Sequence, residues 1–540
     1  MASARHRHVT RGGSWIPGLA ALSIVSVLGL PRPDKIVAEA PAPPDSTVVV
    51  SAAPAPPTPN IMDLRRDLSE LLNTGSLRRA KWSVLVVSLD RGDTLFSRDP
   101  YRPLAPASNM KIVTAAAALH VLGPKFQYQT FVFADGPIVD GHLRGDLILY
   151  GTGDPGISDR FFRNRSGAFE HLADQVAADG ITHVDGAVVG DATYFSGPDL
   201  GPEWNPRDLN EWFAAAAPSL SFNENMVTLQ ILPAAQLGSP PRVVTIPADF
   251  PLAMNNGAET VAGRPRPRLW LDRVTPTAVI RMDGEIRQGG PDIWRRLTVP
   301  DPALFAARAF RETLDSVGVW VRDPENAVHF PSPSRITGRQ SWAPGLIGPE
   351  EPRLIAQHTS PKMIDYLTVM NHESHNLFAE TILKTVGKIS QGEGSFEGGA
   401  RAIRSFATGQ LGLASDQIQA TDGSGLSEGN RASAGAFVQL LSYVAKSPYW
   451  EPFMSTLPEA GRSLRRMYRT PAARNLRAKT GTIDGVSALT GVVGTRDGET
   501  LLFSILSNDL ASTGAAKRVE NRLGVRLAEF RRGPEISNDP

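Results

Sequence analysis

The sequence predicts an α+β protein whose antiparallel sheet is built from both ends of the chain, with a large mainly-β domain inserted between them. Three observations support this prediction. A helix followed by two strands is expected after residue 60, and two strands followed by a helix are expected before residue 531. From about 137 to 332 the chain is rich in Gly and Pro, with short apolar runs separated by turn residues.

The N-terminal part of the sheet is predicted from periodicity and turns. Leucines with helical spacing form the first helix: Leu64, Leu68, Leu71 and Leu72. The apolar run 82–89 is typical of a buried strand, Asp90-Arg-Gly-Asp is a turn, and residues 94–97 form the returning strand. This order predicts a hairpin covered by a helix.

The C-terminal part mirrors this order. Residues 486–495 and 500–506 are predicted strands, joined by the turn Arg496-Asp-Gly-Glu. A closing helix follows, and its apolar residues lie on one face: Val519, Leu523, Leu527 and Phe530. We therefore expect a single domain from 61–136 and 333–540, with 137–332 as the inserted mainly-β domain.

Composition narrows the functional classes. At 540 residues the chain can form two or more domains. Its formal net charge is only +1, without the basic excess of a nucleic-acid-binding protein. There is no cysteine, which excludes disulfides, thiolate metal sites and a cysteine nucleophile.

Residues 1–60 are predicted to target and tether the protein. A basic start at Arg5, Arg7 and Arg11 precedes the apolar run 15–30 and the small-residue site Ala38-Glu39-Ala40, as in a signal peptide. Pro41 disfavours cleavage there, so an uncleaved membrane anchor is an alternative, and a disordered tail is another. The Pro/Ala-rich stretch 31–59 fits an extended linker. This start predicts an exported bacterial protein that is periplasmic or otherwise extracytoplasmic.

The first candidate catalytic motif holds Ser108 and Lys111. Pro106 precedes a strongly helical run, so Ser108 is expected near a helix N-terminus with Lys111 one turn away on the same face. A serine hydroxyl needs a nearby base to become a nucleophile, and a lysine whose pKa is lowered by burial can supply it. Taken alone, the pair also fits an ordinary helix start with an exposed lysine.

Two further motifs follow. Ser374 and Asn376 fall between two helical patterns, 362–370 and 377–384, and are expected at a loop tip. His372 and His375 lie nearby without the i, i+4 spacing of a zinc site. Lys479, Thr480 and Gly481 begin a predicted strand, where a lysine beside a glycine's open backbone could hold a substrate carboxylate. Each motif alone also fits a polar turn or a strand start.

Together, the order Ser-x-x-Lys, Ser-x-Asn, Lys-Thr-Gly resembles that of penicillin-binding proteins and serine β-lactamases. The separation of 266 positions from Ser108 to Ser374 resembles the large insertion of the D-alanyl-D-alanine carboxypeptidase/endopeptidase family, the class C low-molecular-mass penicillin-binding proteins. The segments that carry this resemblance are Gly190-Asp-Ala-Thr-Tyr-Phe, Gly201-Pro-Glu-Trp, Leu220-Ser-Phe-Asn, Thr421-Asp-Gly-Ser-Gly-Leu-Ser and Asn430-Arg-Ala-Ser. The resemblance implies a penicillin-binding/β-lactamase-like transpeptidase domain, with a sheet flanked by helices and a helical lobe.

The resemblance also implies a role for each motif residue. Ser108 would be the acylated nucleophile and Lys111 its general base. Ser374 would pass a proton to the leaving group, and Asn376 would position the substrate amide and Lys111. Lys479, which would supply positive charge, would be the fifth catalytic residue. The substrate-binding residues would be Thr480, Gly481, Thr482 and, in the inserted domain, Asp208.

Backbone N–H groups of Ser108 and Thr482 would form the oxyanion hole. Asp208 would bind the amino group of a diaminopimelate side chain, although a solvated surface carboxylate is the alternative. Asp422 and Ser424 are taken as parts of a structural turn. His375 stands where the family commonly has Asp, so activity is expected to survive with altered proton transfer or pH dependence.

The implied activity is a serine-type D-Ala-D-Ala carboxypeptidase or endopeptidase that acts on peptidoglycan stem peptides through an acyl-enzyme. β-Lactams would inhibit it by acylating Ser108, and no metal or organic cofactor is expected. Three alternatives stay open: a β-lactamase or esterase with the same motifs, a catalytically silent wall-binding protein, and a transpeptidase that makes cross-links.

Overall fold

The structure, a computed structural model, describes residues 59–247, 252–263, 268–274, 279–336 and 352–533. The predicted signal peptide or anchor and nearly all of the predicted linker lie outside these ranges. Within them, no helix combines the length and the apolar character that a membrane span requires.

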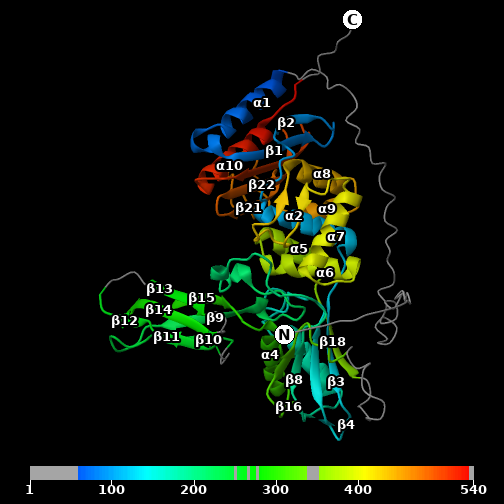
Figure 1. The fold of residues 1–540 in the computed structure, drawn as a ribbon, viewed down its shortest axis with the longest axis vertical. Helices are drawn as coiled ribbons and strands as arrows, with labels where there is room; N and C mark the ends of the chain where they lie inside the picture. Colours follow the sequence, from blue (N-terminus) through cyan, green and yellow to red (C-terminus); the bar gives the residue numbers. More distant parts are fainter. Residues whose placement is uncertain (1–58, 248–251, 264–267, 275–278, 337–351, 534–540) are drawn as a thin grey trace, which may run out of the picture. The chain divides into compact units, whose positions relative to one another are not determined.

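The central sheet contains strands from both ends of the chain, as predicted (Figure 1). Its order is β2-β1-β23-β22-β21, and every neighbouring pair is antiparallel. The elements are α1 (Pro59–Leu72), β1 (Lys81–Ser88), β2 (Thr94–Arg98), β21 (Arg477–Ile483), β22 (Val486–Gly494), β23 (Thr500–Asn508) and α10 (Thr513–Glu529). The order leaves β21 at one edge of the sheet.

Both faces of this sheet are buried, because the strands alternate between two cores. Side chains such as Val84, Leu489 and Phe503 pack with α1 and α10. Their neighbours in the chain, such as Leu85 and Leu502, face the opposite way and pack with helices from the middle of the chain. The nearly continuous apolar sequence of these strands is thereby explained.

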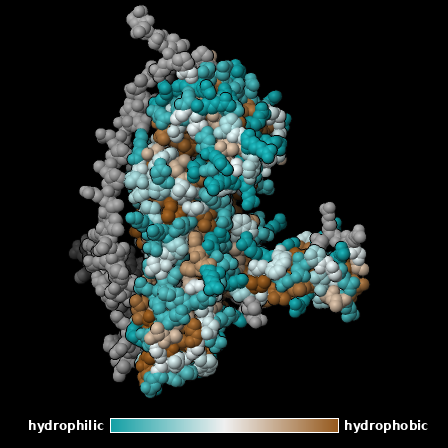
Figure 2. All heavy atoms as spheres, turned by 180° about the vertical axis from the view of Figure 1, so that it is seen from behind, coloured by the Kyte–Doolittle hydropathy of each residue, from teal (hydrophilic) through white to brown (hydrophobic). Residues whose placement is uncertain are grey.

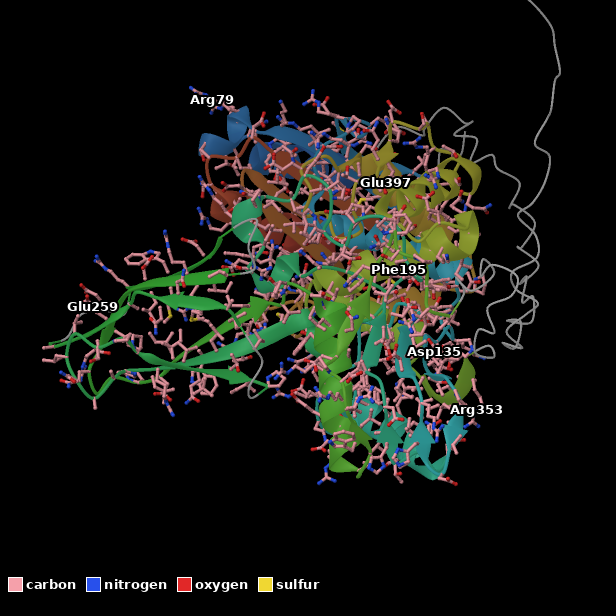
Figure 3. The ribbon with its side chains drawn as sticks, turned by 60° about the horizontal axis from the view of Figure 1, so that its bottom comes forward. Arg79, Asp135, Phe195, Glu259, Arg353 and Glu397 are labelled. Carbon is pink, nitrogen blue, oxygen red and sulfur yellow. The ribbon has the colours of Figure 1, made fainter. Side chains whose placement is uncertain are left out.

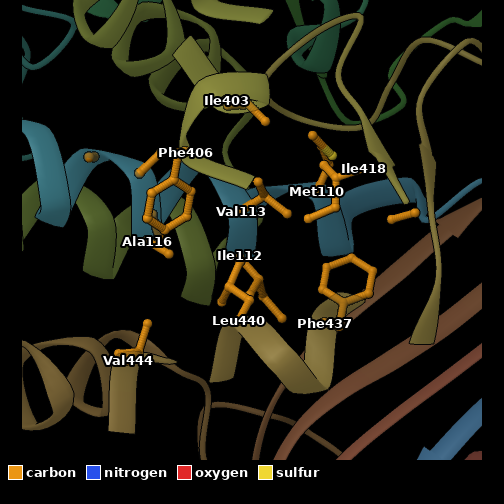
Figure 4. Close-up of a cluster of buried hydrophobic side chains, with 14 of the residues drawn as sticks. Met110, Ile112, Val113, Ala116, Ile403, Phe406, Ile418, Phe437, Leu440 and Val444 are labelled. Atoms are coloured by element: carbon orange, nitrogen blue, oxygen red, sulfur yellow. The ribbon is translucent and has the colours of Figure 1, made fainter. Parts of the chain in front are cut away.

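The helices on that second face form a helical lobe around α2. They are α2 (Met110–Val121), α5 (Met363–His372), α6 (Asn376–Gln391), α7 (Phe396–Gly409), α8 (Ala434–Ala445) and α9 (Trp450–Thr456), with the short pair β19 (Ile418–Gln419) and β20 (Arg431–Ala432). Figure 4 shows Ile112 and Val113 of α2 among Phe406, Phe437 and Leu440 from α7 and α8. Ten consecutive residues of α2 are buried, so this helix is fixed on all sides.

Residues 129–359, which we call the inserted segment, contain a second large sheet of order β17-β8-β6-β3-β18. Its strands are β3 (Gln129–Asp135), β6 (Asp146–Gly151), β8 (Val188–Asp191), β17 (Asn326–Val328) and β18 (Arg353–Thr359). Two helices that the sequence analysis did not predict, α3 (Gly167–Ala178) and α4 (Pro302–Ser316), contribute to the core of the inserted segment. Short strands complete this part: β4 (Ile138–Val139), β5 (His142–Leu143), β7 (His183–Val184) and β16 (Trp320–Val321).

The inserted segment also carries two smaller sheets, of order β10-β9-β15 and β11-β14-β12, with β13 paired to β14. These strands are β9 (Met226–Leu232), β10 (Arg242–Ile246), β11 (Met254–Asn256), β12 (Glu259–Val261), β13 (Arg268–Val274), β14 (Val279–Arg287) and β15 (Ile293–Thr298). The 3-10 helices of the described chain are η1 (Gly75–Arg79), η2 (Ala107–Asn109), η3 (Pro206–Asp208), η4 (Trp212–Ala214) and η5 (Asn223–Asn225).

The predicted domain limits of 137 and 332 stay a prediction. The pairing of the strands on either side of these limits shows which segments lie together there. β3 and β18 flank those positions in the chain and pair antiparallel with each other, with Arg353 opposite Ala134. Figure 3 shows Asp135 and Arg353 at the same end of this sheet. Both strands therefore share one sheet with β6 and β8.

Lys384 of α6 ties the helical lobe to the inserted segment. Its side chain has no exposed surface. Its ammonium donates to the carbonyls of Pro198 (3.1 Å) and Ala217 (3.0 Å) and lies 5.3 Å from the ring centroid of Phe195, which Figure 3 labels. Because an unpaired buried ammonium is very costly, these acceptors are required for the lysine to be buried.

The face in Figure 2 is mostly hydrophilic, and its apolar side chains form separate patches among polar ones. Such a mixture is ordinary for a folded surface in water.

Replacing Phe437 should strongly destabilise the protein. Phe437→Ala leaves a cavity against α2, and we expect a loss of about 3–5 kcal/mol in the free energy of unfolding, measured by urea denaturation. Ile389→Ala is the control, because this side chain is 50% exposed, and its effect should stay within about 0.5 kcal/mol. Equal effects of the two substitutions would contradict the described core.

Candidate active site

The turn before α2 holds Ser108. Residues 107–109 form η2, which continues directly into α2, and Ala107 adopts a left-handed conformation (φ 46°). Ser108 is half-buried and Lys111 is fully buried in the first turn of α2. The packed core around α2 therefore fixes where both side chains point.

Lys111 is surrounded by neutral acceptors. Its Nζ lies 3.2 Å from Ser108 Oγ, 2.7 Å from Asn376 Oδ1 and 2.9 Å from the carbonyl oxygen of Ser424. Burial lowers the pKa of Lys111, and the nearby acidic groups Glu380 and Asp422 oppose this only in part. A lysine in this state can accept a proton from the serine that it contacts.

The second motif lies where α5 ends and α6 begins. Ser374 has a left-handed backbone (φ 57°), which is uncommon for a non-glycine residue, and its Oγ accepts a bond from Lys479 Nζ at 3.0 Å. Asn376 is the first residue of α6, and its Nδ2 donates to the carbonyl of Phe213 at 2.8 Å. The predicted loop tip thus faces both lysines and contacts the inserted segment.

The third motif lies on the edge strand β21. Lys479 is 1% exposed and also donates to the carbonyl of Thr480 at 2.8 Å. Burial and the charge of Lys111 hold the pKa of Lys479 well below its ordinary value. A Cβ at Gly481 would lie 2.6 Å from the carbonyl oxygen of Pro106, so only glycine lets β21 approach the nucleophile turn this closely. Thr480 is half-buried and Thr482 is exposed on the same strand.

A loop formed by residues 421–430 closes the site from the side of α6. The Asp422 carboxylate accepts bonds from Gly425 N (2.7 Å) and Ser427 N (2.6 Å), which shapes the turn. Asp422 also accepts from Trp204 Nε1 of the inserted segment at 3.0 Å. Ser424 contributes to the site through its backbone carbonyl rather than its hydroxyl.

The sequence analysis missed Glu380, which is fully buried beneath this loop. Its carboxylate accepts from Gly423 N at 2.6 Å and Ser424 N at 3.1 Å. Burial raises the pKa of Glu380 above its ordinary value. The sequence could have indicated Glu380, because it follows Asn376 by one helical turn and therefore lies on the same face of α6.

His375 and Asp208 have different surroundings. His375 is buried, and its Nε2 lies 3.0 Å from the carboxylate of Glu224, another residue that the sequence analysis missed. Asp208 is half-buried in η3, and within the described chain its carboxylate forms no hydrogen bond with the three motifs. The structure therefore brings Ser108, Lys111, Ser374, Asn376 and Lys479 together, while the Asp208 carboxylate is not hydrogen-bonded to any of them within the described residues.

Residues 64–530 match the model of the D-Ala-D-Ala carboxypeptidase 3 (S13) family. The chain belongs to this family. It is 32% identical over 485 residues to the D-alanyl-D-alanine carboxypeptidase of Actinomadura sp. (strain R39), covering 87% of this chain and 85% of that protein. It is 25% identical to the D-alanyl-D-alanine carboxypeptidase DacB of Haemophilus influenzae, covering 88% and 92%.

Solved structures support the same fold. Penicillin-binding protein 4 (dacB) of Haemophilus influenzae superposes with a TM-score of 0.72 at 23% identity, covering 86% of this chain and 100% of that chain. The predicted family, the α+β fold and the serine peptidase class are confirmed. The roles of individual motif residues stay predictions.

Removing the Glu380 carboxylate should destabilise the loop. Glu380→Ala leaves two buried backbone N–H groups without acceptors, and each typically costs about 1–3 kcal/mol. Glu380→Gln keeps one acceptor oxygen and should cost less. Urea denaturation measures both, with exposed Glu259→Ala (Figure 3) as the control. A loss no larger than that of the control would contradict this role.

Proposed function

We propose that Ser108 is the nucleophile of a D-Ala-D-Ala peptidase that cleaves peptidoglycan stem peptides through an acyl-enzyme. The observation that carries the proposal is the contact of Lys111 Nζ with Ser108 Oγ at 3.2 Å in a fully buried position. Burial favours the uncharged amine, which is the form that can act as a base.

The acylation step follows from these contacts. Ser108 Oγ attacks the carbonyl carbon of the penultimate D-Ala, and its proton passes to Lys111 Nζ. The carbonyl oxygen gains negative charge, which the backbone N–H groups of Ser108 and Thr482 stabilise. The peptide C–N bond then breaks, and the leaving amine takes a proton from the hydroxyl of Ser374, which contacts Lys479. Ser374 regains a proton from Lys111, which returns the lysine to its neutral form. Water hydrolyses the resulting ester and restores Ser108.

The substrate would lie along the edge strand β21. An edge strand presents unpaired backbone groups, to which an extended peptide can add as a further strand. Lys479, Thr480 and Thr482 would then contact the terminal carboxylate, with Lys479 supplying positive charge. Asp208 would bind an amino group further along the stem peptide.

The leaving group decides the reaction. If it is a terminal D-Ala, the enzyme is a carboxypeptidase, and if it is the D-centre of a neighbouring stem, the enzyme is an endopeptidase. A β-lactam would acylate Ser108, and the resulting acyl-enzyme would hydrolyse slowly. One solved relative, penicillin-binding protein 4 of Haemophilus influenzae, is described in complex with a β-lactam. Cell-wall substrates imply an extracytoplasmic location, and we propose export to the periplasm through residues 1–60.

Covalent labelling tests the nucleophile. After incubation with benzylpenicillin, intact-protein mass spectrometry should show one added drug mass on the unmodified protein and none on Ser108→Ala. Lys111→Ala should slow acylation by about 10²–10⁴-fold, because the base is lost.

A protein that stays unlabelled while the drug stays intact would support a wall-binding protein instead. An unlabelled protein with destroyed drug would support a β-lactamase. If labelling succeeds, release of D-Ala from a stem pentapeptide and cleavage of a purified cross-linked dimer distinguish the two peptidase activities. Transfer to an added amine acceptor would indicate a transpeptidase.

The rate of acylation should rise with pH and level off below the ordinary lysine pKa of 10.5. Lys111 acts as a base only when it is deprotonated, and burial lowers its pKa, so the rising limb moves to lower pH. Stopped-flow measurement of acylation by a fluorescent penicillin from pH 5 to 10 gives this limb. A rate that still rises at pH 10 would contradict the assignment of Lys111 as the base.

A further inference from the structure

We propose that Glu224 and His375 form a positioning pair, through which the inserted segment fixes the geometry of the second motif. This inference rests on the proposed function, since Ser374 and Asn376 are the residues that the pair would position. Among the described residues, neither Glu224 nor His375 forms a hydrogen bond with Ser108 or Lys111, so both would act through their neighbours.

His375 is held on several sides. Its side chain is 3% exposed, with Nε2 at 3.0 Å from Glu224 Oε2. Its ring lies 4.4 Å from that of Phe378 and 6.3 Å from that of Trp212, measured between centroids. The residues on either side of it, Ser374 and Asn376, contact Lys479 and Lys111 respectively. A shift of the imidazole would therefore displace both catalytic contacts.

Glu224 occupies an unusual backbone position. Asn223, Glu224 and Asn225 are all left-handed, with φ of 50°, 55° and 58°. Non-glycine residues rarely adopt this conformation, and it persists only where surrounding structure enforces it. Here Asn225 donates to the carbonyl of Ala216 at 2.9 Å and accepts from Phe222 N at 3.2 Å. The strained turn directs the Glu224 carboxylate toward His375.

The same carboxylate reaches the second motif by another path. Glu224 Oε1 accepts from Arg160 Nε at 2.6 Å, and Arg160 Nη1 donates to Glu373 at 2.7 Å. Glu373 directly precedes Ser374. Arg160 and Glu224 also line a cavity of about 320 Å³ within the inserted segment. The loop 373–375 is thus connected to Glu224 directly through His375 and indirectly through Arg160.

The chemistry of His375 argues against a purely structural side chain. Since Glu224 accepts through a carboxylate, Nε2 carries the proton, and the buried Nδ1 has no hydrogen-bond partner in the described chain. An aromatic hydrocarbon would fill this space between Phe378 and Trp212 without leaving a polar atom unsatisfied. What the imidazole adds is a directional bond to the inserted segment.

A double-mutant cycle tests the pair. Glu224→Ala and His375→Ala should each lower the maximal rate of acylation by a fluorescent penicillin about 10- to 100-fold, because misplacing catalytic groups by about 1 Å costs this much. The penicillin concentration for half-maximal rate should change little. The double variant should be no slower than Glu224→Ala alone, since Glu224→Ala already removes the bond to His375. Glu224→Gln keeps an acceptor oxygen for His375 and should recover most of the rate.

The control is Asp199→Asn, which weakens a different link between the inserted segment and α6, the contact of Asp199 with Lys384 at 3.4 Å. Asp199→Asn should leave the acylation rate unchanged, even if its melting temperature shifts as much as that of the Glu224 and His375 variants.

Unchanged acylation in Glu224→Ala, or losses of rate that simply add in the double variant, would overturn the proposal. If the alanine variants do not fold, the acylation rates of Glu224→Gln and His375→Gln decide the matter. The pair is supported if Glu224→Gln loses no more rate than Asp199→Asn while His375→Gln is clearly slower. It is overturned if His375→Gln is not slower. Failure of the unmodified protein to acylate would instead refute the proposed function.

Discussion

Burial of the Lys111 side chain is the constraint on which the active site depends. A buried ammonium requires nearby acceptors, and here they come from three separate stretches of the chain: Ser108, Asn376 and the carbonyl of Ser424. The loop that offers this carbonyl is itself held by Glu380. Assembly of the site and lowering of the lysine pKa are therefore two results of the same burial.

The second lysine is placed by the sheet. β21 is an edge strand, so one of its sides is hydrogen-bonded to β22 while the other faces the turn that holds Ser108. Gly481 permits this approach, and Lys479 reaches Ser374 from the same strand. The charge of Lys111 adds to burial in lowering the pKa of Lys479.

Much of this could be predicted from the sequence. The central sheet follows from local periodicity and turn residues at 82–97 and 486–506, and the three motifs follow from their order. Glu224 could not be predicted, because its role depends on a left-handed turn and on a partner 151 residues away. The helices α3 and α4 were missed among Gly- and Pro-rich neighbours, although Asp301 with Pro302 is a normal helix start.

The buried Lys384 has a consequence for how this architecture can change. Its acceptors, the carbonyls of Pro198 and Ala217, belong to the inserted segment, as does the Phe213 carbonyl that Asn376 uses. Excising 137–332 to obtain a minimal catalytic unit would remove both carbonyl acceptors of Lys384 and release one side of the second motif. The insertion is thus not a module that evolution or an engineer can delete alone.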